Sequence, residues 1–285
     1  MKSYHYILFL FLLLFSTMFS QDKGHLVIIG GGDRYEAMMQ KIVEFAGGDN
    51  SKIVVIPNAS SEPIESGESM VREFKNLGCK DVIYLYCTRD NADADSNLAK
   101  LSGVTGIYFC GGDQSFLTRD LLNTKLLRKI KEIYHDGGVI SGTSAGAAVM
   151  SEVMITGNEL INKDSTSAFI TIQKGNIETV EGFGFIKSGI IDQHFLKRKR
   201  HNRLITVVLE YPQLIGIAID ESTAIVVSLG RTFEVMGENQ VIIYDATKAK
   251  NIRVDKNGNL GAENITMQIL LSGNKYDLAN REVIE

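Results

Sequence analysis

The stretch Val139-Ile140-Ser141-Gly142-Thr143-Ser144-Ala145-Gly146-Ala147-Ala148 carries the pattern that decides the fold. Its first three residues predict a short buried strand, and the apolar run from Ala145 to Met150 predicts the start of a helix. Gly-x-Ser-x-Gly at a strand-to-helix turn is typical of a nucleophile elbow, where the flanking glycines allow a sharp turn and expose the serine hydroxyl. The helix N-terminus beneath favours negative charge. Ser144 is therefore a candidate nucleophile, and the alternative is a plain tight turn before a packed helix.

Apolar runs alternate with amphipathic stretches on both sides of this motif. Strands are predicted at 26–29, 53–56, 82–86, 107–110, 190–194 and 215–219. Helices are predicted between them, with Asp33 as a cap for the first one and a single long helix from Gln114 to Ile133. Strands that are apolar almost throughout and alternate with helices indicate an α/β fold, a parallel sheet with helices on both faces.

The remaining segments predict no second domain. The polar stretch from Gly157 to Gly184 is predicted as a loop or hairpin, and short alternating strands are expected after Gly230. Because no linker or repeat is present, residues 21–285 are predicted to form one domain. The cysteines Cys79, Cys87 and Cys110 form no Cys-x-x-Cys pair, so free thiols are favoured, with a bridge between the first two left open.

The first twenty residues predict export. Lys2 and His5 precede the apolar run Ile7–Phe15, and Ser16-Thr17-Met18-Phe19-Ser20 follows it. This pattern is typical of a secretory signal, and the run is short for a transmembrane helix. We therefore expect a periplasmic or secreted protein with no stable membrane association after signal cleavage.

Composition narrows the function classes. Among the 285 residues, 44% are hydrophobic and 22% are charged, which is typical of a globular protein with a sizeable core. The formal net charge of -4 argues against nucleic acid as the main partner.

A serine nucleophile needs a base and a carboxylate to orient that base. His194 ends an apolar strand, which places it at the rim where Ser144 is expected. Glu221 follows the strand 215–219 and is our preferred orienting acid. Asp192 is the rival, because residues two apart on a strand point the same way.

Backbone amides and a basic run complete the predicted crevice. The amide of Ala145 and one from the Gly111-Gly112 turn, taken as that of Gly112, are candidates for an oxyanion hole. The run Lys197-Arg198-Lys199-Arg200-His201, with Arg203, leaves the strand directly after His194. Arginines there can grip substrate carboxylates, and the alternative is a solvated helix start. Gly30-Gly31-Gly32 lacks the spacing of a nucleotide fingerprint and is interpreted as a crevice-lining turn.

The chain resembles the cyanophycinases and the Asp- and isoaspartyl-directed dipeptidases. The matching segments, which occur in family order over the mature chain, are Gly30–Gly32, Gly111–Gln114, Gly142–Gly146, Ile190–Phe195, Arg198, Arg200, Arg203 and Gly216–Ala224. The resemblance implies a flavodoxin-like fold related to class I glutamine amidotransferases, with serine in place of cysteine. It assigns Ser144 as nucleophile, His194 as base and Glu221 as orienting acid.

The resemblance also implies the substrate. Cyanophycin is a polyaspartate with arginine on each side-chain carboxyl, and cyanophycinases release β-Asp-Arg dipeptides from it without a cofactor or metal. The family's pocket positions match Gln114, Asp192, Gln193, Arg198, Arg200 and Arg203.

We therefore expect an exported serine exopeptidase that degrades cyanophycin through an acyl-enzyme. The alternatives are a dipeptidase of the same fold acting on short Asp or isoAsp peptides, and a non-catalytic binding relative. An α/β-hydrolase esterase is disfavoured, because its triad acid normally precedes the histidine. The expected partner is a polypeptide-like substrate, and a homodimer is an open possibility.

Overall fold

The computed structural model describes residues 24–163 and 169–284, so the expected signal segment lies outside the described residues. The largest sheet has nine strands: β1 His25–Ile29, β2 Lys52–Ile56, β3 Asp81–Tyr84, β4 Gly106–Phe109, β5 Val139–Thr143, β10 Thr223–Ser228, β11 Thr232–Gly237, β16 Lys275–Asp277 and β17 Glu282–Ile284. Their order is β17-β16-β11-β10-β1-β5-β4-β2-β3. The strands from β1 to β3 in this order are parallel, and β10, β11, β16 and β17 add an antiparallel extension.

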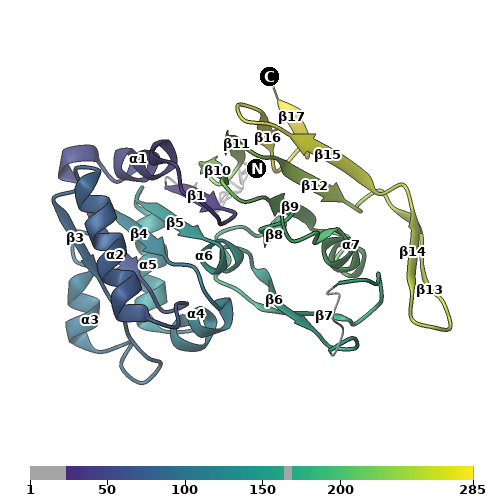
Figure 1. Ribbon diagram of the computed structural model, residues 1–285, viewed down its shortest axis with the longest axis horizontal. Coiled ribbons are helices and arrows are strands. Elements are labelled where there is room, and N and C mark those ends of the chain that lie inside the picture. Colours follow the sequence, from purple (N-terminus) through teal and green to yellow (C-terminus); the bar gives the residue numbers. More distant parts are fainter. Residues whose placement is uncertain (1–23, 164–168, 285) are drawn as a thin grey trace, which may run out of the picture.

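Helices cover both faces of the parallel strands, as predicted (Figure 1). Their bounds are α1 Glu36–Phe45, α2 Pro63–Asn76, α3 Asp95–Lys100, α4 Gln114–Leu121, α5 Lys125–His135, α6 Ala145–Ala148 and α7 His201–Glu210, with a 3-10 turn at Gly48–Asn50. The α1 and α2 helices bury Met38, Ile42 and Phe74 against one face. The α4 and α5 helices bury Leu117 and Ile130 against the other.

Two predictions on helices are wrong. The segment from Gln114 to Ile133 forms two helices, because Asn123 takes a left-handed φ of 63° and Thr124 caps α5 by accepting a hydrogen bond from Leu127 N at 3.0 Å. The apolar spacing continues across this break, so periodicity alone hides it. Asp33 does not cap α1 either; Tyr35 occupies that position in an extended conformation.

A second sheet corrects the expectation of a single one. It contains β8 Gly189–Gln193, β9 Ile215–Ile219, β12 Val241–Asp245 and β15 Thr266–Leu270, in the order β15-β12-β9-β8. Only β8 and β9 are parallel to each other. Strand β1 already has β5 on one side and β10 on the other, so it offers no free edge to β8 or β9. The turn 220–222 then carries the chain from β9 in one sheet to β10 in the other.

The remaining strands form two separate hairpins. The hairpin predicted from Gly157 to Gly184 begins earlier, with β6 Val153–Glu159, which pairs antiparallel with β7 Ile177–Glu181. Strands β13 Lys250–Val254 and β14 Leu260–Glu263 form an exposed arm that projects from the body in Figure 1. All three cysteines are buried free thiols, as favoured from the sequence. Within the described residues, no helix is both long enough and apolar enough to span a membrane.

Candidate active site

Ser144 stands at the sharp turn between β5 and α6. It has φ 54° and ψ -108°, a conformation that L-residues rarely adopt. Both flanking glycines are sterically required, because a Cβ on Gly142 would lie 2.6 Å from Gly146 O and one on Gly146 would lie 2.3 Å from Phe109 O. The motif therefore forms the predicted elbow. The α6 helix spans only four residues, so any stabilisation of negative charge comes from single amides rather than from a long helix dipole.

His194 and Glu221 complete a hydrogen-bonded series with this serine. Ser144 Oγ lies 2.8 Å from His194 Nε2, and His194 Nδ1 lies 2.6 Å from Glu221 Oε1. His194 follows β8 and Glu221 follows β9, two adjacent parallel strands of the second sheet, whereas Ser144 follows β5 of the first. The three side chains thus meet between two sheets instead of at the rim of one.

Burial and nearby charges set the pKa of the His194 imidazole. His194 is 7% exposed, and this burial is the main cause that lowers its pKa from 6.5. The hydrogen bond to Glu221 opposes the shift, while the charges of Arg198 and Arg200 add to it. A lowered pKa keeps the ring neutral near pH 7, the form in which Nε2 can accept the serine proton.

The end of β1 and the loop after it hold all three turns in place. Ser144 N donates to Ile29 O at 3.0 Å, His194 N donates to Gly30 O at 2.8 Å, and Ser222 N donates to Gly31 O at 2.8 Å. Three successive carbonyls therefore fix the nucleophile turn, the histidine turn and the turn that carries Glu221. This role of the glycine loop could not be predicted from the sequence, because it depends on contacts with three distant segments.

Glycine is the only residue that fits against the imidazole. Gly31 has φ +110°, and a Cβ there would lie 2.2 Å from His194 Cε1. A Cβ on Gly32, at φ +69°, would lie 2.8 Å from Glu221 Cβ. Both side chains of the base and its partner thus pack directly on glycine backbone, which explains why this loop carries no side chains.

Two further residues, also missed from the sequence, fix the acid. Asp220 Oδ1 accepts a hydrogen bond from Lys197 N at 3.0 Å, which ties the turn after β9 to the turn after β8. Asn239 Nδ2 donates to Glu221 O at 2.8 Å. Asp220 lies within the matching segment Gly216–Ala224, but its contact with Lys197 N, like that of Asn239 with Glu221 O, joins segments distant in the sequence and could not be predicted from either one.

The two amides expected to form the oxyanion hole, those of Ala145 and Gly112, make no hydrogen bond among the described residues. Gly112 has φ +137°, and a Cβ there would lie 1.9 Å from Ala59 O, so only glycine fits. A Cβ built on Gly111 would lie 3.4 Å from Ser144 Cβ, which places this turn beside the nucleophile.

Asp192 lies apart from the imidazole and pairs with arginine instead. Arg203 Nε donates to Asp192 Oδ2 at 2.8 Å, Arg203 Nη2 donates to Oδ1, and Arg200 Nη1 lies 3.8 Å from Oδ1. Asp192 and Arg203 are each 1% exposed. Glu221, and not its rival Asp192, is therefore the carboxylate beside His194 Nδ1. Because Arg203 and Asp192 are buried in their own ion pair, they do not reach the predicted crevice.

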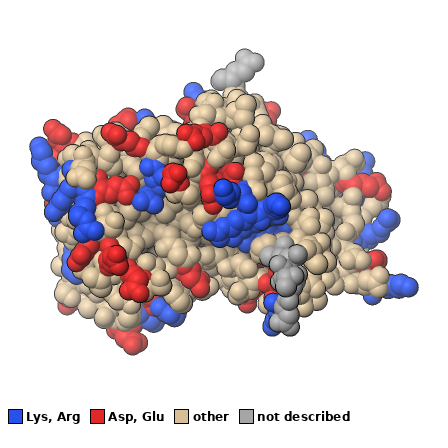
Figure 2. Space-filling view, in the orientation of Figure 1, with Lys and Arg blue, Asp and Glu red and all other residues tan. Residues whose placement is uncertain are grey.

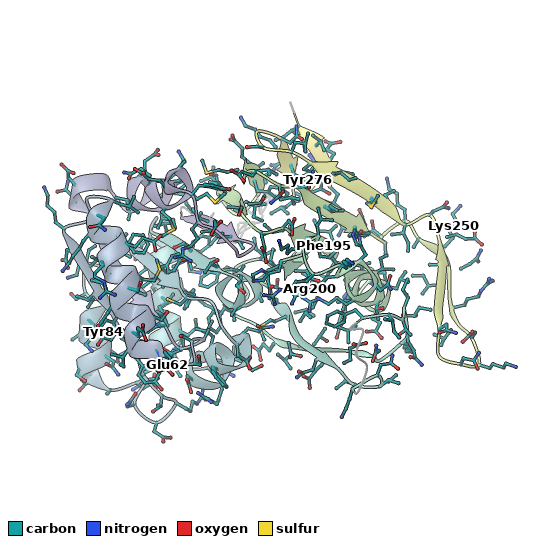
Figure 3. All side chains as sticks on the ribbon, viewed as in Figure 1. Glu62, Tyr84, Phe195, Arg200, Lys250 and Tyr276 are labelled. Carbon is teal, nitrogen blue, oxygen red and sulfur yellow. The ribbon has the colours of Figure 1, made fainter. Side chains whose placement is uncertain are left out.

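The other predicted substrate-binding residues differ in exposure. Arg200 is buried and donates to Gln193 O and Oε1, both at 2.5 Å; burial, with Arg203 nearby, lowers the pKa of Arg200 to about 10. Gln114 is buried, and its Nε2 donates to Ile155 O at 2.9 Å. Arg198 alone among them is exposed. Figure 2 shows one dense blue patch near the middle of this face, where Figure 3 places Arg200.

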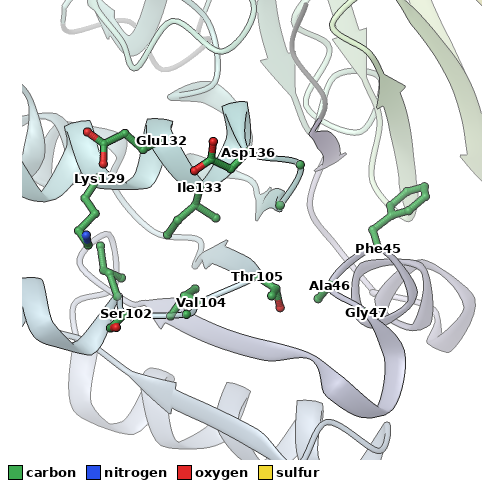
Figure 4. Close-up of a pocket in the computed structure, with 14 residues that line it drawn as sticks. Phe45, Ala46, Gly47, Ser102, Val104, Thr105, Lys129, Glu132, Ile133 and Asp136 are labelled. Carbon is green, nitrogen blue, oxygen red and sulfur yellow. The ribbon is translucent and has the colours of Figure 1, made fainter.

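One pocket of the structure lies far from Ser144, His194 and Glu221. Its volume is about 610 Å³, and its lining includes Val104, Thr105 and Gly138, which precede β4 and β5 (Figure 4). It is therefore at the amino ends of the parallel strands, opposite the end that carries Ser144. Ligands of open α/β sheets bind at the carboxyl ends, so this pocket is not part of the catalytic site. Within the described residues, no cluster of three His, Cys, Asp or Glu side chains could hold a metal ion.

The elbow and the Ser-His-Glu series define a class of protein, the serine hydrolases, here on an α/β fold. The comparisons with known proteins narrow this class. The family model described as Peptidase family S51 matches residues 26–235, and the chain belongs to this family of serine-type peptidases.

Relatives cover most of the chain. A cyanophycinase of Synechococcus elongatus is 33% identical over 275 residues, covering 93% of this chain and 82% of the relative. A cyanophycinase of Geminocystis herdmanii is 31% identical over 263 residues, covering 90% and 94%. The crystal structure of a peptidase from an acI-B1 Actinobacterium aligns with a TM-score of 0.68 at 25% identity, covering 90% of this chain and 98% of that one. These matches support a peptidase of cyanophycinase type.

Proposed function

We propose that this protein hydrolyses cyanophycin to β-Asp-Arg dipeptides through an acyl-enzyme on Ser144. The observation that carries the proposal is the unbroken series Ser144 Oγ, His194 Nε2, His194 Nδ1 and Glu221 Oε1, with separations of 2.8 and 2.6 Å. The similarity to cyanophycinases supports the choice of polymer.

In the acylation step, Ser144 Oγ attacks the carbonyl carbon of a backbone amide between two aspartyl residues. The hydroxyl proton passes to His194 Nε2, while Glu221 accepts a hydrogen bond from Nδ1 and stabilises the imidazolium. The amides of Ala145 and Gly112 stabilise the oxyanion. When the tetrahedral intermediate collapses, the C–N bond breaks and His194 returns its proton to the leaving amine.

In the deacylation step, water takes the place of the amine. His194 removes a proton from this water, the resulting oxygen attacks the ester carbonyl, and the ester C–O bond breaks. The proton returns to Ser144 Oγ. The buried, neutral imidazole is suited to both steps.

We also propose a finer fold class and a location. The strand order β3-β2-β4-β5 reproduces four strands of the flavodoxin order 2-1-3-4-5, which supports a flavodoxin-like fold related to class I glutamine amidotransferases. The strand β1 at the next position departs from that order. The apolar run in residues 1–20 supports export of a single peptidase domain, 21–285, that acts on polymer outside the cytoplasm.

Incubation with purified cyanophycin tests the proposal. The chain lacking residues 1–20 should dissolve the polymer and release β-Asp-Arg, identified by mass spectrometry, and Ser144→Ala should release none. An inert polymer alongside rapid cleavage of short Asp or isoAsp peptides would replace the proposal with the dipeptidase alternative.

A further inference from the structure

A pocket of about 410 Å³ adjoins the nucleophile on the α2 side. Its lining includes Thr143, the residue before Ser144, and Gly111 beside Ser144. It opens at the carboxyl ends of β4 and β5, where ligands of such sheets bind. A peptide held at Ser144 extends on both sides of the scissile bond. A side chain of one flanking residue can therefore enter this pocket.

Two side chains of the pocket lining, Tyr108 and Arg34, carry unpaired hydrogen-bond donors. Tyr108 is fully buried, and its hydroxyl has no hydrogen-bond partner in the described part of the chain. Burial raises the pKa of Tyr108, so the hydroxyl stays protonated. Arg34 Nη2 donates to Glu73 at 2.8 Å, but Arg34 Nε has no partner, and 29% of the Arg34 side chain remains exposed. Burial also raises the pKa of Cys110 in the lining to about 11, so that thiol adds no charge.

The exposed rim of the pocket carries negative charge. Glu62 and Glu65 lie there, both exposed, near the start of α2 (Figure 3 labels Glu62). Among the described residues neither forms an ion pair, whereas Glu73 pairs with Arg34 and Glu68 pairs with Arg72. Two unpaired carboxylates at a pocket mouth favour a cationic ligand group, and a guanidinium can bond both oxygens of a carboxylate.

We propose that this pocket binds an arginine residue whose α-carboxylate is free, with the carboxylate toward Arg34 and Tyr108 and the guanidinium between Glu62 and Glu65. The inference deepens the proposed function and rests on it. An arginine inside an ordinary peptide has no free α-carboxylate. The arginine branch of cyanophycin is joined through its α-amine, so it presents both charged groups. The pocket therefore serves as the subsite that distinguishes this branched polymer from plain aspartyl peptides.

Calorimetric binding of Nα-acetyl-L-arginine tests this subsite without requiring turnover. The probe carries the amide, the free carboxylate and the guanidinium of the branch. We expect it to bind about tenfold or more tightly than Nα-acetyl-L-citrulline, which lacks the cation, and than N-acetylagmatine, which lacks the carboxylate. The double variant Glu62→Gln/Glu65→Gln should abolish the preference over citrulline. Glu68→Gln, on the same helix but outside the pocket, should keep it.

The kinetics give a second readout. With a short β-Asp-Arg polymer, the double variant should raise KM about tenfold and leave kcat and covalent labelling of Ser144 nearly unchanged. Probe binding that is absent in the wild type, or equal in the double variant and in Glu68→Gln, would overturn the subsite. If the probe binds as expected but the polymer stays intact, the subsite stands and the proposed function fails.

Discussion

The substitution Gly31→Ala tests whether the glycine loop positions the catalytic base. The new Cβ would lie 2.2 Å from His194 Cε1, whereas ordinary contact begins at 3.4 Å. The imidazole must therefore move by about 1.2 Å, or the loop must shift by a similar amount. Because a misplacement of about 1 Å can cost about 10²-fold in rate, we expect kcat to fall about 100-fold, equal to about 2.7 kcal/mol in the activation barrier.

The control variant Gly78→Ala separates the steric displacement of the imidazole from the effect of backbone strain. Gly78 also has a left-handed φ of +91°, but nothing lies within 4 Å of a Cβ placed there. Both alanine variants should lose about 1–2 kcal/mol of stability from the left-handed conformation, and thermal melts will show whether the losses match. Only Gly31→Ala should lose activity.

The assay is steady-state hydrolysis of β-Asp-Arg polymer together with the rate of Ser144 labelling by a fluorophosphonate. We expect Gly31→Ala to lower kcat and the labelling rate in parallel while KM stays within about threefold, since the substrate pocket is untouched. If kcat of Gly31→Ala stayed within threefold of Gly78→Ala, the loop would not position His194, and the reasoning from its steric contact would be refuted.

Four further predictions concern the acid, the base and the buried ion pair. Glu221→Gln should lower kcat about 10³–10⁴-fold, because the amide cannot stabilise the imidazolium; near-normal turnover would remove Glu221 from this role. As the pH is lowered, kcat/KM should decrease with an apparent pKa below 6.5, because burial disfavours protonated His194 and the neutral base persists to lower pH. Arg198→Ala should move this apparent pKa upward, since it removes a repelling charge, and a downward shift would contradict the cause assigned. Arg203→Met should reduce the free energy of unfolding by about 3–5 kcal/mol in denaturant titrations, because it leaves Asp192 buried without its main partner; a variant as stable as the wild type would show that the pair contributes nothing.

The parallel strands and the elbow were predictable because their signals are local. A run such as Ile53–Ile56 is apolar throughout, and Gly142 and Gly146 mark the turn by themselves. His194 and Glu221 could also be predicted from the sequence, because His194 directly follows one buried strand and Glu221 closely follows another. A residue at such a position is placed by the sheet itself.

The remaining features depend on contacts between distant segments. Nothing in Ile190–His194 indicates that its strand leaves the first sheet; that follows from β10 occupying the edge of β1. Asp192 and Arg203 are eleven positions apart, and their burial, which removes them from the crevice, depends on packing of α7 against β9. The role of Gly31 likewise appears only when His194 is seen against it.

Mass spectrometry of the trapped enzyme tests the catalytic centre most directly. After brief incubation with β-Asp-Arg polymer and an acid quench, we expect a mass added on the peptide that contains Ser144, absent from Ser144→Ala and strongly reduced in His194→Ala. Polymer cleavage that continues in Ser144→Ala, or an adduct on any other residue, would contradict it.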